Sequence, residues 1–226
     1  MGSKRLQHFG GDIRLYDAIG QDSSDVPNFV RHIGLSLEEG SFTVGDILSV
    51  RIVEMIPPLS DPEASTAQAV DVVASIELNA IELRQIKAFV NELISEYQLF
   101  DADPNGQYHI FPHFVERDGD DSCRRFSCAG FVVNAYGDAG VLLIDFTQLP
   151  DIGLETLVTA YPDRDRGLRI GRYRAKAGLV GDGPWPVLLP GYVFHSMNRD
   201  PDTCRKTPYT AQAGDECFPA STSTAN

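Results

Sequence analysis

The chain has 226 residues, of which 42% are hydrophobic, and it carries a formal net charge of −13. A chain of this length can bury a substantial core and fits one large domain. Its acidic balance gives no electrostatic footprint for nucleic acid or for anionic lipid surfaces. We therefore expect no nucleic-acid partner, and binding to either kind of polyanion would require a local basic patch.

The sequence shows neither a membrane span nor a signal peptide. No stretch approaches eighteen consecutive apolar residues, and the first twelve residues lack the apolar core that a signal peptide needs. We therefore expect no membrane span and a cytoplasmic location. An exported location stays open if the opening Met1-Gly2-Ser3 replaces a signal peptide that was removed.

The spacing of the cysteines and histidines gives no metal site. The four cysteines match no zinc-binding pattern and are too few for a disulfide scaffold, so we expect a mostly reduced protein, although Cys204 and Cys217 could close a small loop. His109 and His113 flank Pro112, which argues against a helical metal pair. We expect no metal and no cofactor.

The first part of the chain predicts short strands. The segment from Gly10 to Leu15 is a turn followed by a short alternating run, and a strand begins near His32. In that strand Ile33, Leu35 and Leu37 share one face, and His32, Gly34 and Ser36 share the other. The turn residues at positions 38–40 then predict a hairpin with a histidine at its mouth.

A second alternating run extends from Ile47 to Ile56 and places a carboxylate in line with apolar neighbours. Leu48, Val50 and Ile52 share their face with Glu54. A carboxylate on an apolar face is costly unless it is paired. Glu54 therefore has a partner there, or the strand ends and releases it to water.

A third strand, from Val70 to Leu78, is followed by a helix. Asn79 with Glu82 three residues later has the pattern of a capping box. After it, an apolar stripe recurs at helical spacing, formed by Leu83, Ile86, Val90, Leu93 and Tyr97. We expect this helix to pack on the sheet and to carry no chemistry.

The segment from Phe126 to Asp145 places a thiol at the start of a helix. Ser127 is a good N-cap, so Cys128 falls in the first turn, where backbone N–H groups and the helix dipole favour a thiolate. Gly140 is placed to end the helix as a left-handed cap. Cys128 is then a nucleophile or, alternatively, a buried structural cysteine, since free cysteine is often buried.

The rest of the chain gives weaker patterns. The segment from Phe146 to Pro184 interleaves arginines and aspartates, which favours a solvated hairpin over an anion site. The segment from Trp185 to Phe194 predicts a last pair of strands. Residues 199–226 are expected to form a loosely ordered tail.

The residues FSCAGFVVNAYGDAG, from Phe126 to Gly140, resemble the cysteine motif of the NlpC-type papain-like cysteine peptidases. In that superfamily the histidine usually follows the cysteine, on a strand of the pattern His-aliphatic-Gly-aliphatic. Here the matching residues, His32-Ile33-Gly34-Leu35, precede Cys128 by 96 residues. This reversed order resembles the circularly permuted branch, which includes bacterial hydrolase-like proteins and the lecithin:retinol-acyltransferase-like enzymes.

Further elements agree with the permuted order. Gly11-Asp12-Ile13 resembles the turn before the histidine strand, and VEMIPPL, from Val53 to Leu59, resembles the segment that follows it. The similar elements span about residues 10 to 145, and residues 146–226 have no counterpart in the pattern. The wider separation between His32 and Glu54, 22 residues, departs from the family.

The resemblance implies a catalytic triad. Cys128 attacks a carbonyl carbon, His32 moves the proton, and Glu54 orients the imidazole, with Asp46 as the alternative third member. His195 is a weaker candidate for the histidine, because the residues after it do not fit the motif, and His8 has no motif around it. The backbone N–H of Cys128 would supply half of an oxyanion hole.

Taken together, these observations predict an α+β protein with the permuted papain-like fold, in which an antiparallel sheet or small barrel packs against helices that include the nucleophile helix. Residues 1–198 form the single domain and residues 199–226 the tail. The expected activity is a cysteine hydrolase that cleaves a peptide or cell-wall amide, or an ester. Its substrate would be a peptide, a peptidoglycan fragment or an acyl lipid. The alternatives are a lipid acyl hydrolase or acyltransferase of the same fold and a non-catalytic binding module.

Overall fold

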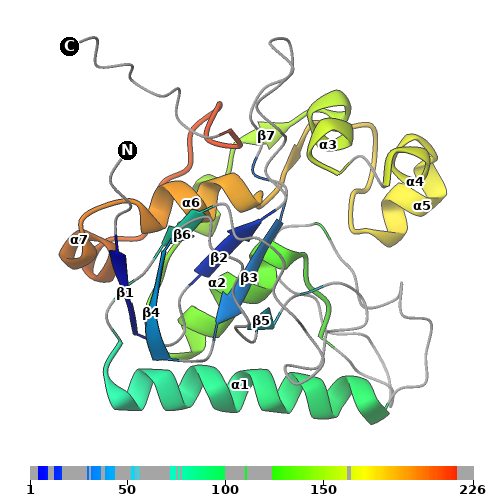
Figure 1. The fold of residues 1–226 in the computed structure, drawn as a ribbon. Helices are drawn as coiled ribbons and strands as arrows, with labels where there is room; N and C mark the ends of the chain where they lie inside the picture. The colour runs from blue at the N-terminus through cyan, green and yellow to red at the C-terminus, as the bar shows by residue number, and fades with distance from the viewer. Residues whose placement is uncertain are drawn as a thin grey trace, which may run out of the picture.

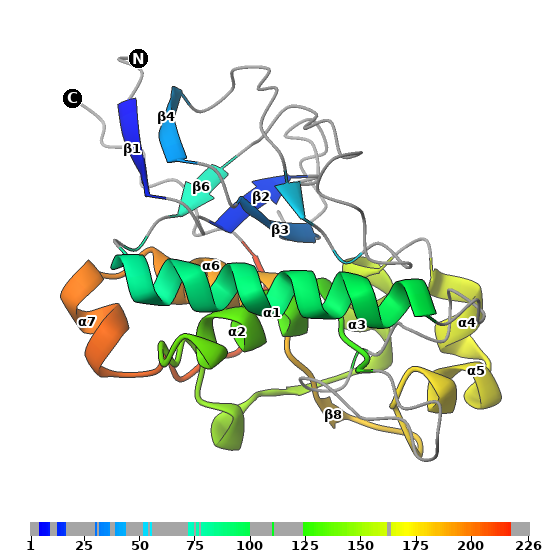
Figure 2. The ribbon, with the colours of Figure 1, turned by 90° about the horizontal axis from the view of Figure 1, so that it is seen from below.

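A computed structural model gives the fold and describes residues 5–9, 13–16, 30, 32–36, 39–43, 52–53, 55, 72–74, 76, 78–99, 110, 124–161 and 164–217. The small antiparallel sheets of the N-terminal strands lie on one side of the longest helix, and most of the other helices lie on its other side (Figures 1 and 2). This arrangement confirms the α+β class.

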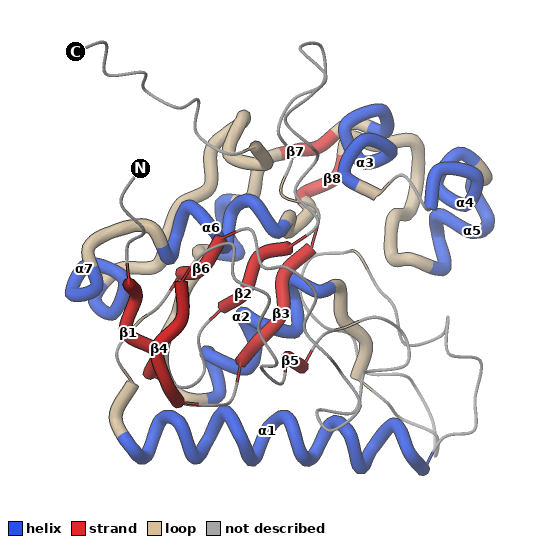
Figure 3. Tube along the Cα trace, in the orientation of Figure 1, coloured by secondary structure: helices blue, strands red, loops and turns tan. Residues whose placement is uncertain are grey.

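Six of the strands form two sheets (Figure 3). Strand β1 (Arg5–Phe9) pairs with β4 (Glu39–Thr43), and a four-stranded sheet has the order β5-β3-β2-β6. Its members are β5 (Ile52–Val53), β3 (His32–Ser36), β2 (Ile13–Tyr16) and β6 (Val72–Ala74), all antiparallel. The predicted hairpin of the two strands on either side of residues 37–38 is wrong. Both edges of β3 are occupied, by β2 and β5, so β4 pairs elsewhere.

Helix α1 (Ala80–Leu99) begins with the predicted capping box. The side-chain oxygen of Asn79 accepts from the backbone N–H groups of Ile81, at 2.8 Å, and Glu82, at 3.0 Å, and Glu82 Oε2 accepts from the N–H of Asn79 at 2.8 Å. The predicted stripe is buried at Leu83, Ile86, Val90 and Leu93. The reciprocal bonds fix where the helix starts and the stripe fixes which side it buries.

Helix α2 (Cys128–Asp138) ends in the predicted glycine cap. Gly140 has φ +80°, its N–H donates to Gly137 O at 2.9 Å, and the N–H of Val141 donates to Tyr136 O at 2.9 Å. These two bonds form a Schellman motif, which satisfies carbonyls that the helix leaves without partners.

Two glycines at the end of this helix should respond to substitution by alanine with stability changes of opposite sign. A Cβ added at either Gly137 or Gly140 meets no atom within 4 Å, but only Gly140 has a positive φ. Gly140→Ala should therefore destabilise the protein by about 1 kcal/mol through backbone strain, and Gly137→Ala should stabilise it by about 0.5–1 kcal/mol. Urea unfolding of the two variants measures both values, and a shift of the same sign in both would contradict the cap.

The C-terminal third is mostly helical, which corrects two sequence predictions. After the short 3-10 helix η2 (Phe146–Gln148), the chain forms helices where a solvated hairpin was expected: α3 (Leu154–Ala160), α4 (Asp165–Arg169) and α5 (Gly171–Lys176). Strand β8 (Trp185–Pro186) pairs with β7 (Asp151–Ile152), not with the residues that follow it. Those residues form helix α6 (Pro190–Met197) instead of a second strand.

Both differences have physical reasons. The charged segment is helical because Asp165 and Arg169 pair at i,i+4, at 2.6 Å, while Leu157 and Leu168 are buried beneath it. In α6, Pro190 occupies the first turn, where its missing N–H costs nothing. That helix is buried almost all round, so its apolar run has no period that separates it from a buried strand.

The expectation of a loosely ordered tail from residue 199 is wrong for residues 199–217, and residues 218–226 lie outside the described part. Helix α7 (Pro201–Lys206) is capped by Asp200, whose side chain accepts from the N–H groups of Asp202 and Thr203. Cys204 is fully buried, and one continuous core includes residues from Val30 to Ala211. Arg205 donates to both carboxylate oxygens of Glu82, at 2.7 and 2.8 Å, and holds the pKa of that carboxyl below its usual range.

Candidate active site

The start of α2 is built as the sequence predicts. Ser127 is the N-cap, fully buried, and its Oγ accepts from the backbone N–H of Gly130 at 3.0 Å. Cys128 is the first residue of the helix and is 2% exposed. Because N–H groups of a helix's first turn have no partners within the helix, negative charge on an atom near Cys128 is favoured there.

Helix α1 holds Arg124 and Phe126, just before helix α2, in place. Arg124 lies 2.9 Å from Glu96 and 3.1 Å from Glu92, and its guanidinium carbon lies 5.3 Å from the centre of the Phe89 ring. Glu96 also accepts from the backbone N–H of Arg124. Phe126, fully buried, packs edge-on against Phe89 with ring centres 6.2 Å apart. These contacts fix the direction in which the chain enters α2.

The contacts between Arg124 and the two glutamates of α1 were not predicted from the sequence. Glu92 and Glu96 stand four residues apart on the predicted α1 helix, so they share one side of it. Two carboxylates on one side of a helix repel each other, so they favour a cation between them. The spacing does not tell which arginine or lysine of the chain that cation is.

Strand β3, which begins at His32, lies beside helix α2, which begins at Cys128. Helix α2 packs against β3, whose first residue is His32, and the backbone of His32 is paired with Tyr16 of β2. Ile33 and Leu35, which share one face of β3 by alternation, are fully buried. The side chain of His32 lies outside the described part of the structure, so the fold brings the helix and the strand together without fixing the distance between the two reacting groups.

Glu54 and Asp46, the two candidates for the third member, both lie outside the described residues. Their surroundings are partly described. Strand β5 pairs with β3 through Leu35 with Val53 and Ser36 with Ile52, so the segment before Glu54 is the neighbour of the histidine strand.

His195 has a structural partner. It lies on α6, and its Nε2 is 2.9 Å from the backbone oxygen of Cys217. Its ring is stacked with that of Tyr209, with centres 6.5 Å apart and planes 13° from parallel. These contacts give His195 a role in holding the C-terminal residues. His8 lies in β1, opposite Gly40, and its side chain is not among those described.

The other described cysteines have surroundings that disfavour a thiolate. Burial raises the pKa of Cys204, whose thiol donates to Ser196 O at 3.0 Å. Burial, and then the charge of Glu216, raise the pKa of Cys217. Both thiols are free, so these two residues do not close the small loop that the sequence left open.

The C-terminal strap, residues 209–217, contacts two segments that lie close in sequence to the candidate site: the residues after α2 and the residue two positions before His32. Tyr209 donates its N–H to Leu143 O, and the N–H of Asp145 donates to Tyr209 O, both at 2.9 Å, just beyond α2. At the other end of the strap, Glu216 O accepts from the N–H of Val30, at 3.1 Å, two residues before His32. The strap therefore ties the lead-in of the histidine strand to the segment that follows the cysteine helix.

No protein-family model, curated protein or solved structure matches the chain. Among the helices that the structure describes, none combines the length and the apolar character needed to cross a membrane.

Proposed function

We propose that the protein is a cysteine hydrolase with the permuted papain-like fold, which cleaves an amide or ester bond through an acyl-enzyme. The observation that supports this most is the packing of α2, which begins at Cys128, against β3, which begins at His32. Nucleophilic catalysis needs a thiol and a base held on neighbouring rigid elements.

In the proposed reaction, His32 takes the proton of the Cys128 thiol, and the sulfur forms a bond to the substrate carbonyl carbon. His32 then gives that proton to the leaving amine or alcohol as the carbonyl bond to it breaks. Water, deprotonated by the same imidazole, releases the acid and returns the thiol. The backbone N–H of Cys128 supplies half of the oxyanion hole in this proposal.

The position of β5 supports Glu54 as the orienting residue. Val53, the last residue of β5, is opposite Leu35 of the histidine strand, and the side chains of Val53, Leu35 and Met55 are all buried. In the proposal Glu54, which lies in sequence between Val53 and Met55, orients the imidazole of His32.

The substrate in this proposal is a peptide or peptidoglycan-type amide, and an acyl lipid is the competing class. The resemblance to the permuted papain-like enzymes covers the elements that carry the proposed catalytic residues and does not extend to residues 146–226. The C-terminal helices and the strap, which differ from the pattern, are where we expect the substrate to be selected.

Alkylation tests the activated pair without a known substrate. At about pH 6, iodoacetamide should label Cys128 about a hundredfold faster than the partly exposed Cys217, since an ordinary thiol is mostly protonated there. His32→Ala should remove most of that advantage, and His195→Gln, the matched histidine control, should not. Site-resolved mass spectrometry gives the three rates in one sample.

Cys204 serves as the internal check of folding, because it is fully buried and should stay unlabelled in every folded variant. If Cys128 labels no faster than Cys217, or if His32→Ala leaves its rate unchanged while Cys204 stays protected, there is no activated pair.

The second candidate function is a non-catalytic binding module that keeps the fold. The burial of Cys128, at 2% exposed, favours it, since a side chain so covered also fits a structural cysteine. The same experiment separates the two, because a structural Cys128 labels as slowly as Cys204.

A further inference from the structure

Cations are concentrated in one short segment of an otherwise acidic protein. Residues 164–176 contain six of the nineteen lysines and arginines and a single carboxylate, that of Asp165, whereas the whole chain has a net charge of −13. This segment consists of α4, α5 and the residues that join them, and it lies at one end of the molecule, away from α7 (Figures 1 and 2).

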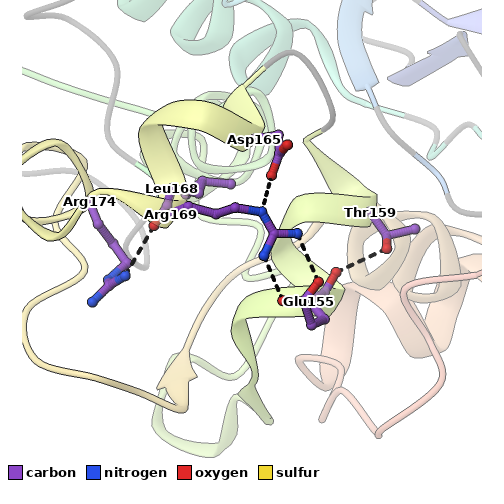
Figure 4. A network of polar contacts seen from close by, with 6 residues as sticks. All are labelled: Glu155, Thr159, Asp165, Leu168, Arg169 and Arg174. Carbon is purple, nitrogen blue, oxygen red and sulfur yellow. Dashed lines mark hydrogen bonds and ion pairs between the residues drawn. The ribbon is translucent and has the colours of Figure 1, made fainter.

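Two of the arginines hold the segment together (Figure 4). Arg169 binds both oxygens of Glu155, at 2.8 and 2.9 Å, and Asp165 at 2.6 Å. Arg174 donates to Leu168 O and to Gly181 O, each at 3.1 Å, with its guanidinium carbon 5.2 Å from the centre of the Trp185 ring. These two side chains are committed to α3, α4 and the turn after α5.

Three other cationic side chains of the segment are exposed to solvent. Arg166, Arg172 and Lys176 are exposed, and within the described part of the chain no carboxylate lies at ion-pair distance from any of them. Arg172 and Lys176 are four residues apart on α5 and share its outer side. Asp182, after α5, is at ion-pair distance from Arg174, at 3.6 Å, so these three cations give the segment a net positive outer surface.

Apolar side chains are also exposed in this segment and just after it. Tyr173 is 45% exposed and lies under Arg172, whose guanidinium carbon is 4.8 Å from the ring centre. Val180 is 77% exposed, and its own carbonyl accepts from the indole N–H of Trp185 at 2.8 Å, which fixes the turn. An amphipathic aromatic ring and an aliphatic tip among cations are features of surfaces that enter the headgroup region of a membrane.

We propose that this surface, formed by Arg166, Arg172, Tyr173, Lys176 and Val180, docks the protein reversibly on an anionic phospholipid bilayer. The cations face the phosphates, and Tyr173 and Val180 enter between headgroups. The acidic remainder of the chain permits this because charges beyond about 10 Å are largely screened at physiological salt. The inference stands independently of the proposed hydrolase, since no residue of the candidate active site takes part.

Vesicle co-sedimentation of the full chain tests the proposal. We expect binding to phosphatidylcholine vesicles that contain phosphatidylglycerol, no binding to phosphatidylcholine alone, and loss of binding at high salt. The triple variant Arg166→Gln, Arg172→Gln, Lys176→Gln should lower the partition coefficient about a hundredfold, from about fivefold per cation near the surface. Tyr173→Ser with Val180→Ser should lower it about tenfold, since both side chains lose apolar contact.

A matched control removes three cations at the opposite end of the molecule: Arg84→Gln, Lys87→Gln and Lys206→Gln. This variant has the same net charge as the first and should keep vesicle binding within about twofold, because charges distant from the surface are screened. An equal loss in both triple variants, or no binding to anionic vesicles, overturns the proposal. Binding of a single-stranded oligonucleotide that is stronger than vesicle binding and indifferent to the Tyr173 and Val180 changes would assign the surface to nucleic acid instead.

Discussion

Replacing Cys128 by alanine is expected to lower the rate of substrate hydrolysis at least about a thousandfold, and His32→Ala should cost about as much. The two residues act as a unit: without the base the thiol stays protonated, and without the thiol the base has nothing to activate. Their combined substitution should therefore cost little more than either alone. The measurement is product release from peptidoglycan fragments and, separately, from a short-chain phospholipid, because these two substrates represent the competing amide and ester classes.

The third residue is identified in the same assay. Glu54→Gln keeps the shape of the side chain and removes its charge, so the loss should be about a hundredfold or more, by analogy with the orienting acid of other triads. Asp46→Asn is the matched control and should change the rate less than about threefold if Glu54 has the role; a reversed order assigns it to Asp46. Normal turnover by Cys128→Ala would contradict the hydrolase as a whole.

Sequence patterns predicted the local features whose chemistry lies within a few residues. The capping box of α1 and the glycine cap of α2 both depend on contacts between residues three to five positions apart, and the structure confirms both. The order of a histidine strand before a cysteine helix was likewise visible. Which strands pair was not visible, because β3 joins to β2 and β5 through segments that carry no short turn.

The errors in the C-terminal third have different causes. In α6 the apolar residues surround the helix, so the alternation or periodicity that separates strand from helix was missing. In α7 a signal was present, since Asp200 followed by Pro201 is a typical helix start. The prediction of a loose tail rested instead on the position of these residues at the chain end, although Cys204 anchors the helix in the core.

The strap is held by a close backbone approach that a single methyl group should disrupt. A Cβ added at Gly191 would lie 2.3 Å from Asp215 O and 2.6 Å from both Glu216 C and Glu216 O. All of these are backbone atoms, so no side-chain rotation relieves the contact, and the strap or α6 must shift. Gly191→Ala should destabilise the protein by about 1–3 kcal/mol, the usual range for overpacking, as measured by urea unfolding.

The displacement also has a local readout. When the strap moves, the backbone oxygen of Cys217 leaves His195, and the half-buried thiol of Cys217 becomes accessible, so its alkylation should accelerate while that of the fully buried Cys204 does not. Gly167→Ala is the matched control, because a Cβ at Gly167, inside α4, meets no atom within 4 Å; like Gly137→Ala it should not lower the stability, and it should leave the labelling of Cys217 nearly unchanged. If Gly191→Ala behaves like Gly167→Ala, the strap does not pack on α6. Gly191→Ala could also slow the labelling of Cys128 while Gly167→Ala does not. In that case the hydrogen bond from the Val30 N–H to Glu216 O helps to hold the histidine strand in position beside Cys128.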